Sequence, residues 1–247
     1  MRNRLAIVLA AGKGTRMKSE LPKVLFPVNG RPMIHFVLDT LKDADINRII
    51  VVVGYKAELV QHELASRLNI EFALQKEQHG TGHAVQVCRP LLEDYDGSVL
   101  ILAGDSPLTQ SESLITLLEE FERRRPACLL GTLHKEDPTG LGRIVRDEKG
   151  GFARIVEEKD ATDEERQITE VNMSTYLFEN AELLHSLAQI KNENKQGEYY
   201  ITDCPGILKG EGKDVSALPA LKPCEALSIN TVDHLAIVEA EMRRMGY

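Results

Sequence analysis

The 247-residue sequence contains no tryptophan, only four cysteines and no long uninterrupted apolar run. The cysteines stand far apart and form no C-x-x-C pair, so the sequence gives no sign of a zinc site or a dithiol redox motif. Without an apolar run of about 20 residues, no membrane-spanning helix is predicted. The short apolar stretch after the basic amino-terminal residues leads into a glycine-rich loop and not into a signal-peptide cleavage site, so we expect a cytoplasmic protein.

The sequence also lacks an excess of positive charge. Its formal net charge is -8 and its pI is about 5.5, so most of the surface should repel nucleic acids and anionic membranes. A hydrophobic share of 43% with 28% charged residues is typical of a soluble globular protein. We therefore expect a folded domain whose partners are small molecules.

Against this acidic background, the amino-terminal region carries a basic, glycine-rich loop. Residues 5–9 are all apolar and predict a buried strand of a parallel sheet. The loop that follows contains Gly12 and Gly14, and its backbone N–H groups can approach an anion where open α/β sheets bind ligands. The basic side chains nearby are Lys13, Arg16 and Lys23. The loop matches neither the dinucleotide-binding pattern nor the P-loop pattern, so a polyphosphate site and a solvated surface turn both explain it when it is considered alone.

Apolar periodicity predicts alternating strands and helices along the rest of the chain. Strands are expected at residues 49–53, 71–74, 98–103, 127–133, 168–178 and 215–218, with a hairpin within residues 144–156. Helices are expected from residue 32, at 58–68, 84–88, 112–122, 160–167 and 180–187, and after Thr231. This order predicts an α/β fold with a Rossmann-like, mixed and mainly parallel sheet flanked by helices.

Two more of the predicted strands end in polar segments. Gln75 and Gln78 follow the third strand, and carboxamides that carry both donors and acceptors suit the edge of a nucleobase. A polar loop that caps a helix explains the same residues. Asp105 follows the strand at 98–103, where a carboxylate is placed to bind a divalent cation. Metal binding by histidine is not predicted.

Taken together and in order, these motifs resemble the signature of sugar-phosphate nucleotidyltransferases. They lie at residues 9–17, 21–23, 75–82, 104–108, 137–144, 157–161 and 196–203, followed by Asn230. Within that family the chain is most similar to the uridyltransferase domains of bacterial bifunctional N-acetylglucosamine-1-phosphate uridyltransferases. The resemblance covers nearly all of the chain.

The resemblance implies one nucleotidyltransferase domain over residues 1–247, with the nucleotide-diphospho-sugar transferase fold. We expect a nucleotide-binding half at about 1–133, a sugar-binding half with a small β lobe at about 134–230, and a C-terminal helix at about 231–247. The bifunctional enzymes continue into a left-handed β-helix with acetyltransferase activity. Because this sequence stops at Tyr247, acetyl transfer is not predicted.

The implied reaction converts UTP and N-acetylglucosamine 1-phosphate to UDP-N-acetylglucosamine and pyrophosphate, with Mg2+ as the cofactor. The sugar phosphate would attack the α-phosphorus in line with the departing pyrophosphate. Positioning and charge neutralisation would then supply most of the catalysis, and no covalent nucleophile is required. No nucleic-acid or membrane partner is expected.

The resemblance also implies roles for individual residues. The catalytic residues would be Arg16, Lys23 and Asp105, with Arg16 and Lys13 on the triphosphate and Lys23 on the sugar phosphate. Asp105 and Asn230 would bind Mg2+, an oxygen-only pair that suits this ion. The nucleotide-binding residues would be Leu9, Ala10, Ala11, Gly12, Lys13, Gly14, Gln75, Gln78, Gly80 and Thr81. The sugar-binding residues would be Gly142, Glu157 and Asn172.

Two positions depart from the family pattern near the expected sugar pocket. The usual Asn-Thr-Gly is Asn172-Met173-Ser174 here, and Ala103 stands where an aromatic residue is common. The same chemistry with another sugar 1-phosphate or with dTTP is therefore an alternative. A catalytically silent subunit that senses nucleotide sugars is an alternative of another class, although the presence of all four expected catalytic and metal-binding residues argues against it.

Overall fold

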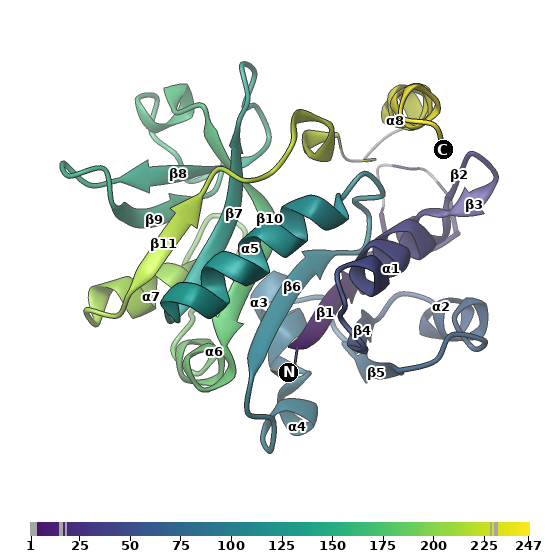
Figure 1. Ribbon diagram of the computed structural model, residues 1–247, viewed down its shortest axis with the longest axis horizontal. Coiled ribbons are helices and arrows are strands. Elements are labelled where there is room, and N and C mark those ends of the chain that lie inside the picture. Colours follow the sequence, from purple (N-terminus) through teal and green to yellow (C-terminus); the bar gives the residue numbers. More distant parts are fainter. Residues whose placement is uncertain (1–3, 15–16, 18, 228, 230–231) are drawn as a thin grey trace.

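The computed structural model describes residues 4–14, 17, 19–227, 229 and 232–247 (Figure 1). Within these residues, one mixed sheet of nine strands runs in the order β11-β7-β10-β6-β1-β4-β5, with β8 beside β10 and β9 beside β8. The strands are β1 (Arg4–Ala10), β4 (Arg48–Val53), β5 (Ile70–Leu74), β6 (Ser98–Ala103), β7 (Cys128–His134), β8 (Gly142–Arg146), β9 (Phe152–Val156), β10 (Glu170–Glu179) and β11 (Val215–Leu218). A separate small ribbon pairs β2 (Pro27–Val28) with β3 (Arg31–Pro32).

The half of the sheet formed by β5, β4, β1 and β6 is entirely parallel. Ala10 at the end of β1 pairs with Val53, and Leu9 pairs with Ala103, so three strands end at one edge. The strands β1, β4 and β6 are rich in buried apolar residues on both faces, as expected for a parallel sheet covered by helices, whereas Ala73 is the buried residue of the edge strand β5. This arrangement confirms the Rossmann-like fold that was predicted from the sequence.

The other half of the sheet is mixed. The long strand β10 runs antiparallel to both β6 and β7, while β11 runs parallel to β7. The predicted hairpin is formed by β8 and β9, and it joins the sheet where Gly142 pairs with Asn172 of β10. The hairpin and the part of β10 that it joins therefore form a small β lobe beside the parallel half.

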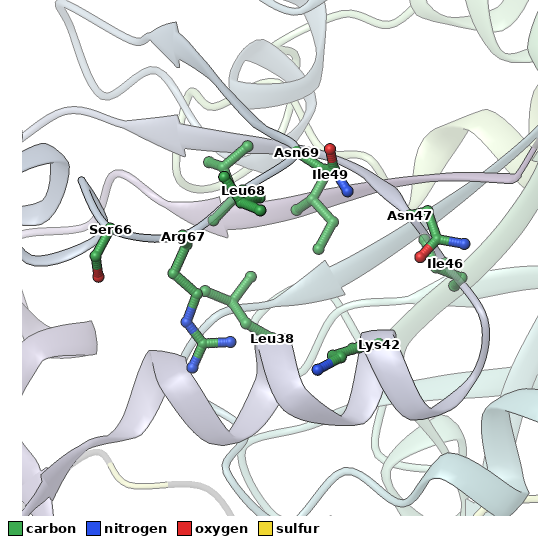
Figure 2. Close-up of a pocket in the computed structure, with 10 residues that line it drawn as sticks. Leu38, Lys42, Ile46, Asn47, Ile49, Ser66, Arg67, Leu68 and Asn69 are labelled. Atoms are coloured by element: carbon green, nitrogen blue, oxygen red, sulfur yellow. The ribbon is translucent and has the colours of Figure 1, made fainter.

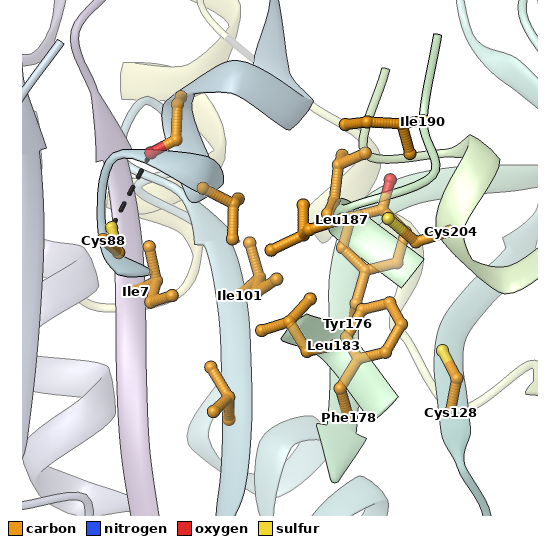
Figure 3. Close-up of a cluster of buried hydrophobic side chains, with 14 of the residues drawn as sticks. Ile7, Cys88, Ile101, Cys128, Tyr176, Phe178, Leu183, Leu187, Ile190 and Cys204 are labelled. Atoms are coloured by element: carbon orange, nitrogen blue, oxygen red, sulfur yellow. Dashed lines mark hydrogen bonds between the residues drawn. The ribbon is translucent and has the colours of Figure 1, made fainter. Parts of the chain in front are cut away.

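Helices cover both faces of the sheet (Figure 1). They are α1 (Met33–Asp43), α2 (Ala57–Glu63), α3 (Thr81–Gln86), α4 (Arg89–Leu92), α5 (Ser111–Arg124), α6 (Asn180–Leu187), α7 (Asp203–Gly210) and α8 (Val232–Arg244). One apolar cluster holds α1, α2 and α5 on one face. A second cluster holds α3, α6 and α7 on the other face, where Tyr176 and Phe178 of β10 lie beside Leu183 of α6 (Figure 3).

A third apolar cluster joins distant parts of the chain at one end of the molecule. Met17 from the first loop and Leu108 from the segment after β6 are buried with Val238 and Met242 of α8. The same cluster contains Met33 at the start of α1. The carboxyl-terminal helix is therefore packed against segments that follow β1 and β6.

The helix predictions differ from the structure in several places. The helix predicted at 58–68 is Ala57–Glu63 in the structure, and the chain then passes through a turn, with Asn69 at a φ of 62°, before β5 begins. The helix predicted at 160–167 is only a short 3-10 turn, Glu165–Gln167. The helix α7 was not predicted, because Asp203–Gly210 contains one proline and two glycines. Pro205 lies in its first turn, where a helix does not use the missing N–H.

Among the described helices, none combines the length and the apolar character needed to span a bilayer. The cytoplasmic location stays a prediction. All four cysteines are free, and burial raises the pKa of the Cys88 and Cys204 thiols to about 12. These two thiols are therefore poor nucleophiles at neutral pH.

Candidate functional site

A cavity of about 310 Å3 opens at the edge where β1, β5 and β6 end. Most of the predicted nucleotide-binding residues line it: Leu9, Ala10, Ala11, Gly12, Gln75, Gln78, Gly80 and Thr81. Lys23 and Asp105 line it as well, so the structure brings two of the predicted catalytic residues to the same cavity. Parallel strands place their carboxyl ends together, which explains how residues so distant in sequence meet.

The first loop brings Lys23 back toward the end of β1. Gly14 has a φ of 63°, and a Cβ atom at this position would lie 2.7 Å from Cβ of Lys23. A glycine is therefore required for the loop to pass this close to Lys23. Lys13 does not line the cavity, because its exposed ammonium lies 5.3 Å from the ring centre of Tyr55. Arg16 lies outside the described residues.

Lys23 and Asp105 form an ion pair within the cavity. The Lys23 ammonium donates to Oδ2 of Asp105, and both side chains are largely buried, with 13% and 26% of their surfaces exposed. The Gly104 N–H donates to the Leu9 carbonyl over 2.9 Å, which fixes the segment that carries Asp105 against β1. A cation and an anion are thus held at one point of the cavity wall.

The donor atoms around Asp105 fit a magnesium ion better than a zinc ion. Oδ1 of Asp105 has no hydrogen bond to any described residue, so this oxygen remains available beside the Lys23 pair. Magnesium is commonly held by one or two carboxylates with phosphate oxygens and water completing its shell. In the part of the chain that the structure describes, no group of three or more His, Cys, Asp or Glu side chains could hold a metal ion. Asn230, the second predicted ligand, lies outside the described residues.

The loop after β5 forms another wall of the cavity, and its geometry is fixed by internal hydrogen bonds. The Gln75 side chain, only 3% exposed, donates through Nε2 to the Gly80 carbonyl over 3.1 Å and lies 3.0 Å from Nδ1 of His83. Gln78 donates through Nε2 to the Gln75 carbonyl over 3.2 Å. Because these hydrogen bonds fix the polar groups of the wall in place, the wall can select a flat ligand by the ligand's pattern of hydrogen-bond donors and acceptors.

The same loop is tied to the segment that precedes α7. The Gly82 N–H donates to the Tyr199 carbonyl over 2.7 Å, and the Tyr199 N–H donates to the His79 carbonyl over 2.8 Å. Gly80 has a φ of 103°, and a Cβ atom there would lie 2.5 Å from the Tyr199 oxygen. Gly80 is therefore required for the close approach of the two segments.

The three predicted sugar-binding residues lie together in the β lobe. Gly142 pairs with Asn172, and a Cβ atom at Gly142 would lie 3.4 Å from Cβ of Asn172 and 3.6 Å from Oε1 of Glu157. Asn172 is buried and donates through Nδ2 to the Tyr176 hydroxyl over 2.7 Å. Thr202 donates through its hydroxyl to Oε1 of Glu157 over 3.0 Å.

The Glu157 carboxyl lies in an environment that disfavours its charge. Burial raises the pKa of this carboxyl, and the negative charges of Asp203 and Asp160 raise it further. The hydrogen bond from Thr202 acts in the opposite direction but does not cancel these effects. A partly buried carboxyl beside a polar asparagine is suited to bind hydroxyl groups of a ligand.

The strand β10 connects this cluster with the cavity at the ends of β1, β5 and β6. Between Asn172 and Thr175 the pairing of β10 with β7 shifts, and Ser174 at this bulge has a φ of 54°. Ser174 lines the cavity. Asn172, two residues earlier in the strand, belongs to the cluster with Gly142 and Glu157. The two groups of predicted residues are therefore neighbours through one irregular strand.

Several residues of the site were not predicted from the sequence. Ser174, Glu198, Ala84 and Val24 line the cavity, and Thr202 contacts Glu157. Glu198 and Thr202 belong to the recognised motif at 196–203, which could have drawn attention to both side chains. His79 and His83 are four residues apart, a spacing at which two histidines on one helix can bind a metal ion together. Here His79 precedes α3 and pairs with Glu77 instead, over 2.7 Å.

Two other cavities contain none of the residues predicted for the site. One, of about 400 Å3, lies at the opposite edge of the sheet where β4 and β5 begin (Figure 2). Its charged residues are Lys42 and Arg67, and Arg67 is already paired with Asp39 over 2.8 Å. The other, of about 710 Å3, lies between β9 and α7. The cavity at the ends of β1, β5 and β6 is therefore the candidate site.

Comparison with known proteins shows the family to which the chain is similar. The family model described as nucleotidyl transferase matches residues 5–220. The chain is 46% identical over 242 residues to "Bifunctional protein GlmU" of Exiguobacterium sibiricum, covering 98% of this chain and 54% of that protein. It is 45% identical over 240 residues to the protein of the same name from Enterococcus faecalis, covering 97% of this chain and 52% of that protein. The chain thus spans about half the length of these relatives.

A solved structure has the same fold. The "Putative Glucose-1-Phosphate Thymidylyltransferase" of Bacillus anthracis, solved in complex with sucrose, aligns with a TM-score of 0.79. The alignment covers 99% of this chain and 97% of that chain at 20% sequence identity.

Proposed function

The chain belongs to the nucleotidyl transferase family, and we propose that it transfers the uridylyl group of UTP to N-acetylglucosamine 1-phosphate, with release of pyrophosphate. The observation that carries the proposal is one cavity lined both by the Lys23–Asp105 pair and by the Gln75–Gly80 loop. A nucleotide requires this combination, because its base needs a fixed polar wall and its phosphates need compensating charge.

The nucleotide would occupy the parallel half of the molecule. Gln75 and Gly80 would contact the base, and the backbone from Ala10 to Gly12 would contact the phosphates at the end of β1. This placement puts the α-phosphate near the edge where β1 and β6 end. Lys13 would serve only at the entrance, because its side chain lies over Tyr55.

The sugar phosphate would approach from the β lobe. Lys23 would neutralise its charge and orient the attacking oxygen toward the α-phosphorus, with pyrophosphate leaving on the far side. Asp105 would hold Mg2+ through the oxygen that Lys23 does not use, and the bound ion would offset the repulsion between the phosphates. The reaction then needs no nucleophilic side chain.

The sugar ring would lie against the cluster of Gly142, Glu157 and Asn172. Gly142 leaves room between the other two, and Glu157 would accept a hydrogen bond from a sugar hydroxyl. Asn172 retains one amide hydrogen and one oxygen lone pair beyond its bonds to Tyr176 and Ser174. A neighbouring acceptor and carboxamide suit an N-acetylated sugar, which carries both hydroxyl and amide groups.

The test is a panel of sugar 1-phosphates incubated with UTP and Mg2+, with pyrophosphate release and the nucleotide sugar both measured. We expect N-acetylglucosamine 1-phosphate to give the highest kcat/KM. An absence of turnover with every sugar would contradict the proposal. Binding of UDP-sugars without any turnover would favour a nucleotide-sugar-sensing subunit instead.

A second candidate keeps the chemistry and changes the substrate. Ala103 lines the cavity at a position where the family commonly has an aromatic residue, so the space beside Asp105 differs from the usual pattern. Glucose 1-phosphate and dTTP therefore belong in the panel. Faster turnover with either of these than with the first pair would establish the second candidate.

A further inference from the structure

The Gln75 carboxamide is fixed in one orientation by its neighbours. The Gly80 carbonyl can only accept a hydrogen bond, so the group that faces it at 3.1 Å must be the Gln75 nitrogen. The second hydrogen of that nitrogen points to Nδ1 of His83 at 3.0 Å. Nδ1 must then be the unprotonated nitrogen of the His83 ring, and the ring proton resides on Nε2. Both amide hydrogens of Gln75 are thereby used inside the protein.

The remaining polar atom of the Gln75 side chain is its oxygen. Oε1 has no hydrogen bond to any residue that the structure describes, and the side chain lines the cavity while being only 3% exposed. The oxygen therefore presents an acceptor to whatever occupies that part of the cavity. Because the side chain is buried, turning it around would leave polar atoms unpaired, at a cost that favours the present orientation.

We propose that His83 is a positioning residue that makes the site select bases with an imino N–H, such as uracil, over cytosine. This inference rests on the proposed function only in assuming that the base lies against Gln75. Uracil and thymine carry a hydrogen on N3, which can donate to Oε1. Cytosine seated in the same way presents an unprotonated N3, which places two acceptors against each other.

Without the His83 acceptor, one hydrogen of the Gln75 amide loses its partner. A buried unpaired N–H is unfavourable, so the amide gains by tilting, with its other hydrogen still bonded to the Gly80 carbonyl, until the released hydrogen faces the cavity. There it can donate to N3 of cytosine. Loss of the acceptor at position 83 should therefore weaken discrimination between UTP and CTP and leave discrimination between UTP and dTTP unchanged, because both of these carry the N3 hydrogen.

The experiment compares His83→Leu with His83→Asn in the full chain. Leucine has no acceptor, whereas the asparagine oxygen can lie near the position of Nδ1 and accept the same hydrogen bond. The kcat/KM values for UTP, dTTP and CTP are measured with one sugar 1-phosphate. We expect the UTP/CTP ratio to fall by at least about tenfold in His83→Leu, the loss expected from one misplaced hydrogen bond, and to be largely restored in His83→Asn.

His79→Leu is the matched control. His79 lies on the same loop with its ring centre 5.2 Å from that of His83, but it bonds Glu77 and is half exposed. Its substitution should leave both ratios unchanged. A His83→Leu variant in which all three nucleotides lose activity equally, with an unchanged UTP/CTP ratio, would overturn the inference and assign His83 a structural role only.

Calorimetric binding of UTP and CTP to the same three variants and to the wild type separates this inference from the proposed function. A wild type that binds UTP more tightly than CTP, with the preference lost in His83→Leu, supports the role of His83 even if no sugar is turned over. A wild type that binds both nucleotides equally, or a preference that survives in His83→Leu, overturns it.

Discussion

Asp105 and Lys23 show how single residues of the site depend on each other. Their opposite charges lie together in a largely buried part of the cavity wall, where each favours the charged form of the other. A ligand phosphate approaching Lys23 necessarily approaches Asp105. A divalent cation on the second Asp105 oxygen would make that approach favourable, which links the metal and the sugar phosphate at one carboxylate.

The Asp105→Ala variant tests this arrangement. We expect it to lose Mg2+-dependent turnover by about a hundredfold to a thousandfold or more, because the site would lose its proposed anionic metal ligand and the ion pair with Lys23. Steady-state kinetics across a Mg2+ titration measures the effect. Circular dichroism and thermal unfolding should show a folded protein, and near-normal activity at saturating Mg2+ would remove Asp105 from the metal role.

The environment of the Glu157 carboxyl suits ligand binding and lowers the stability of the fold. Its pKa is raised in the folded protein by burial and by the neighbouring Asp203 and Asp160. A raised carboxyl pKa means that the folded state holds the proton more strongly than the unfolded state, so this group destabilises the fold as pH rises above the ordinary glutamate pKa of about 4.5. The loss of folding stability reaches its full value once the pH exceeds the raised pKa of Glu157 in the folded state.

The Glu157→Gln variant should therefore be more stable than the wild type at pH 7 to 8. The advantage should shrink as pH falls below about 4.5, where the wild-type carboxyl is protonated in both states. Thermal unfolding of both proteins across this pH range measures it. The variant should also have a higher KM for the sugar 1-phosphate with a smaller change in the KM for UTP, and a variant that is less stable than the wild type at pH 8 would contradict the assignment.

Residues of the site differed in how far the sequence revealed them. Gln75 and Gly80 were identified because they lie within one short motif directly after a predicted strand. Ser174 and Thr202 were not, because their roles depend on contacts with segments far away in the chain, such as the bond from Thr202 to Glu157. Periodicity carries information about local structure and does not show which distant segments will meet.

Among the elements, β6 and α6 coincide with the predicted ranges 98–103 and 180–187. Both are marked by clear apolar patterns and by a sharp change of composition at their ends. The helix α7 was missed because its two glycines lower its helix propensity, although Pro205 fits its first turn and Cys204 and Leu208 pack in the core. The bulge of β10 was also missed, since a shift in strand pairing leaves no pattern in the sequence when the special position is a serine.

That bulge explains one departure from the family pattern. Ser174 stands where the family usually has glycine, and it adopts a φ of 54°, a conformation that costs an ordinary residue about 1 kcal/mol or more. Its position on the cavity wall holds it there between Asn172 and Thr175. The strand thus holds a serine in a conformation that glycine adopts more readily.

Ser174→Gly should raise the free energy of unfolding by about 1 kcal/mol, because glycine adopts this conformation without strain. Urea denaturation measures the change. Ser174→Ala is the matched control, since it removes the hydroxyl and retains the strain, so it should not stabilise the protein. If Ser174→Gly were no more stable than Ser174→Ala, the strain at this bulge would be negligible.

At the scale of the whole molecule, the proposed function assigns the two substrates to the two halves of the sheet. The cavity lies at the end of the parallel half, and Gly142, Glu157 and Asn172 lie in the mixed half. The strand β10 runs between these two groups of residues. The order of strands and helices predicted the parallel half well, because each βαβ unit is local in sequence. The joining of β10 to β6, β7 and β8 could not be predicted in the same way, since these pairings connect segments far apart in the chain.

The third apolar cluster adds a connection that spans almost the full length of the chain. Met242 and Val238 of α8 are buried with Met17 of the first loop and Leu108 of the segment that follows Asp105. Both of these segments carry residues of the candidate site. The docked position of α8 should therefore help to hold the first loop in the shape that binds the triphosphate.

Met242→Ala tests this connection, with Ile237→Ala as the control on the same helix. Met242 is fully buried, so the truncation should weaken the packing of α8 by about 2 to 5 kcal/mol, whereas Ile237 is 53% exposed and should have little effect. Because the weakened contact includes Met17, we expect the KM for UTP to rise several-fold in Met242→Ala, while the KM for the sugar 1-phosphate changes less. Limited proteolysis would show whether α8 is released. A helix that becomes sensitive to protease with no change in the KM for UTP would show that α8 stabilises the fold without shaping the first loop.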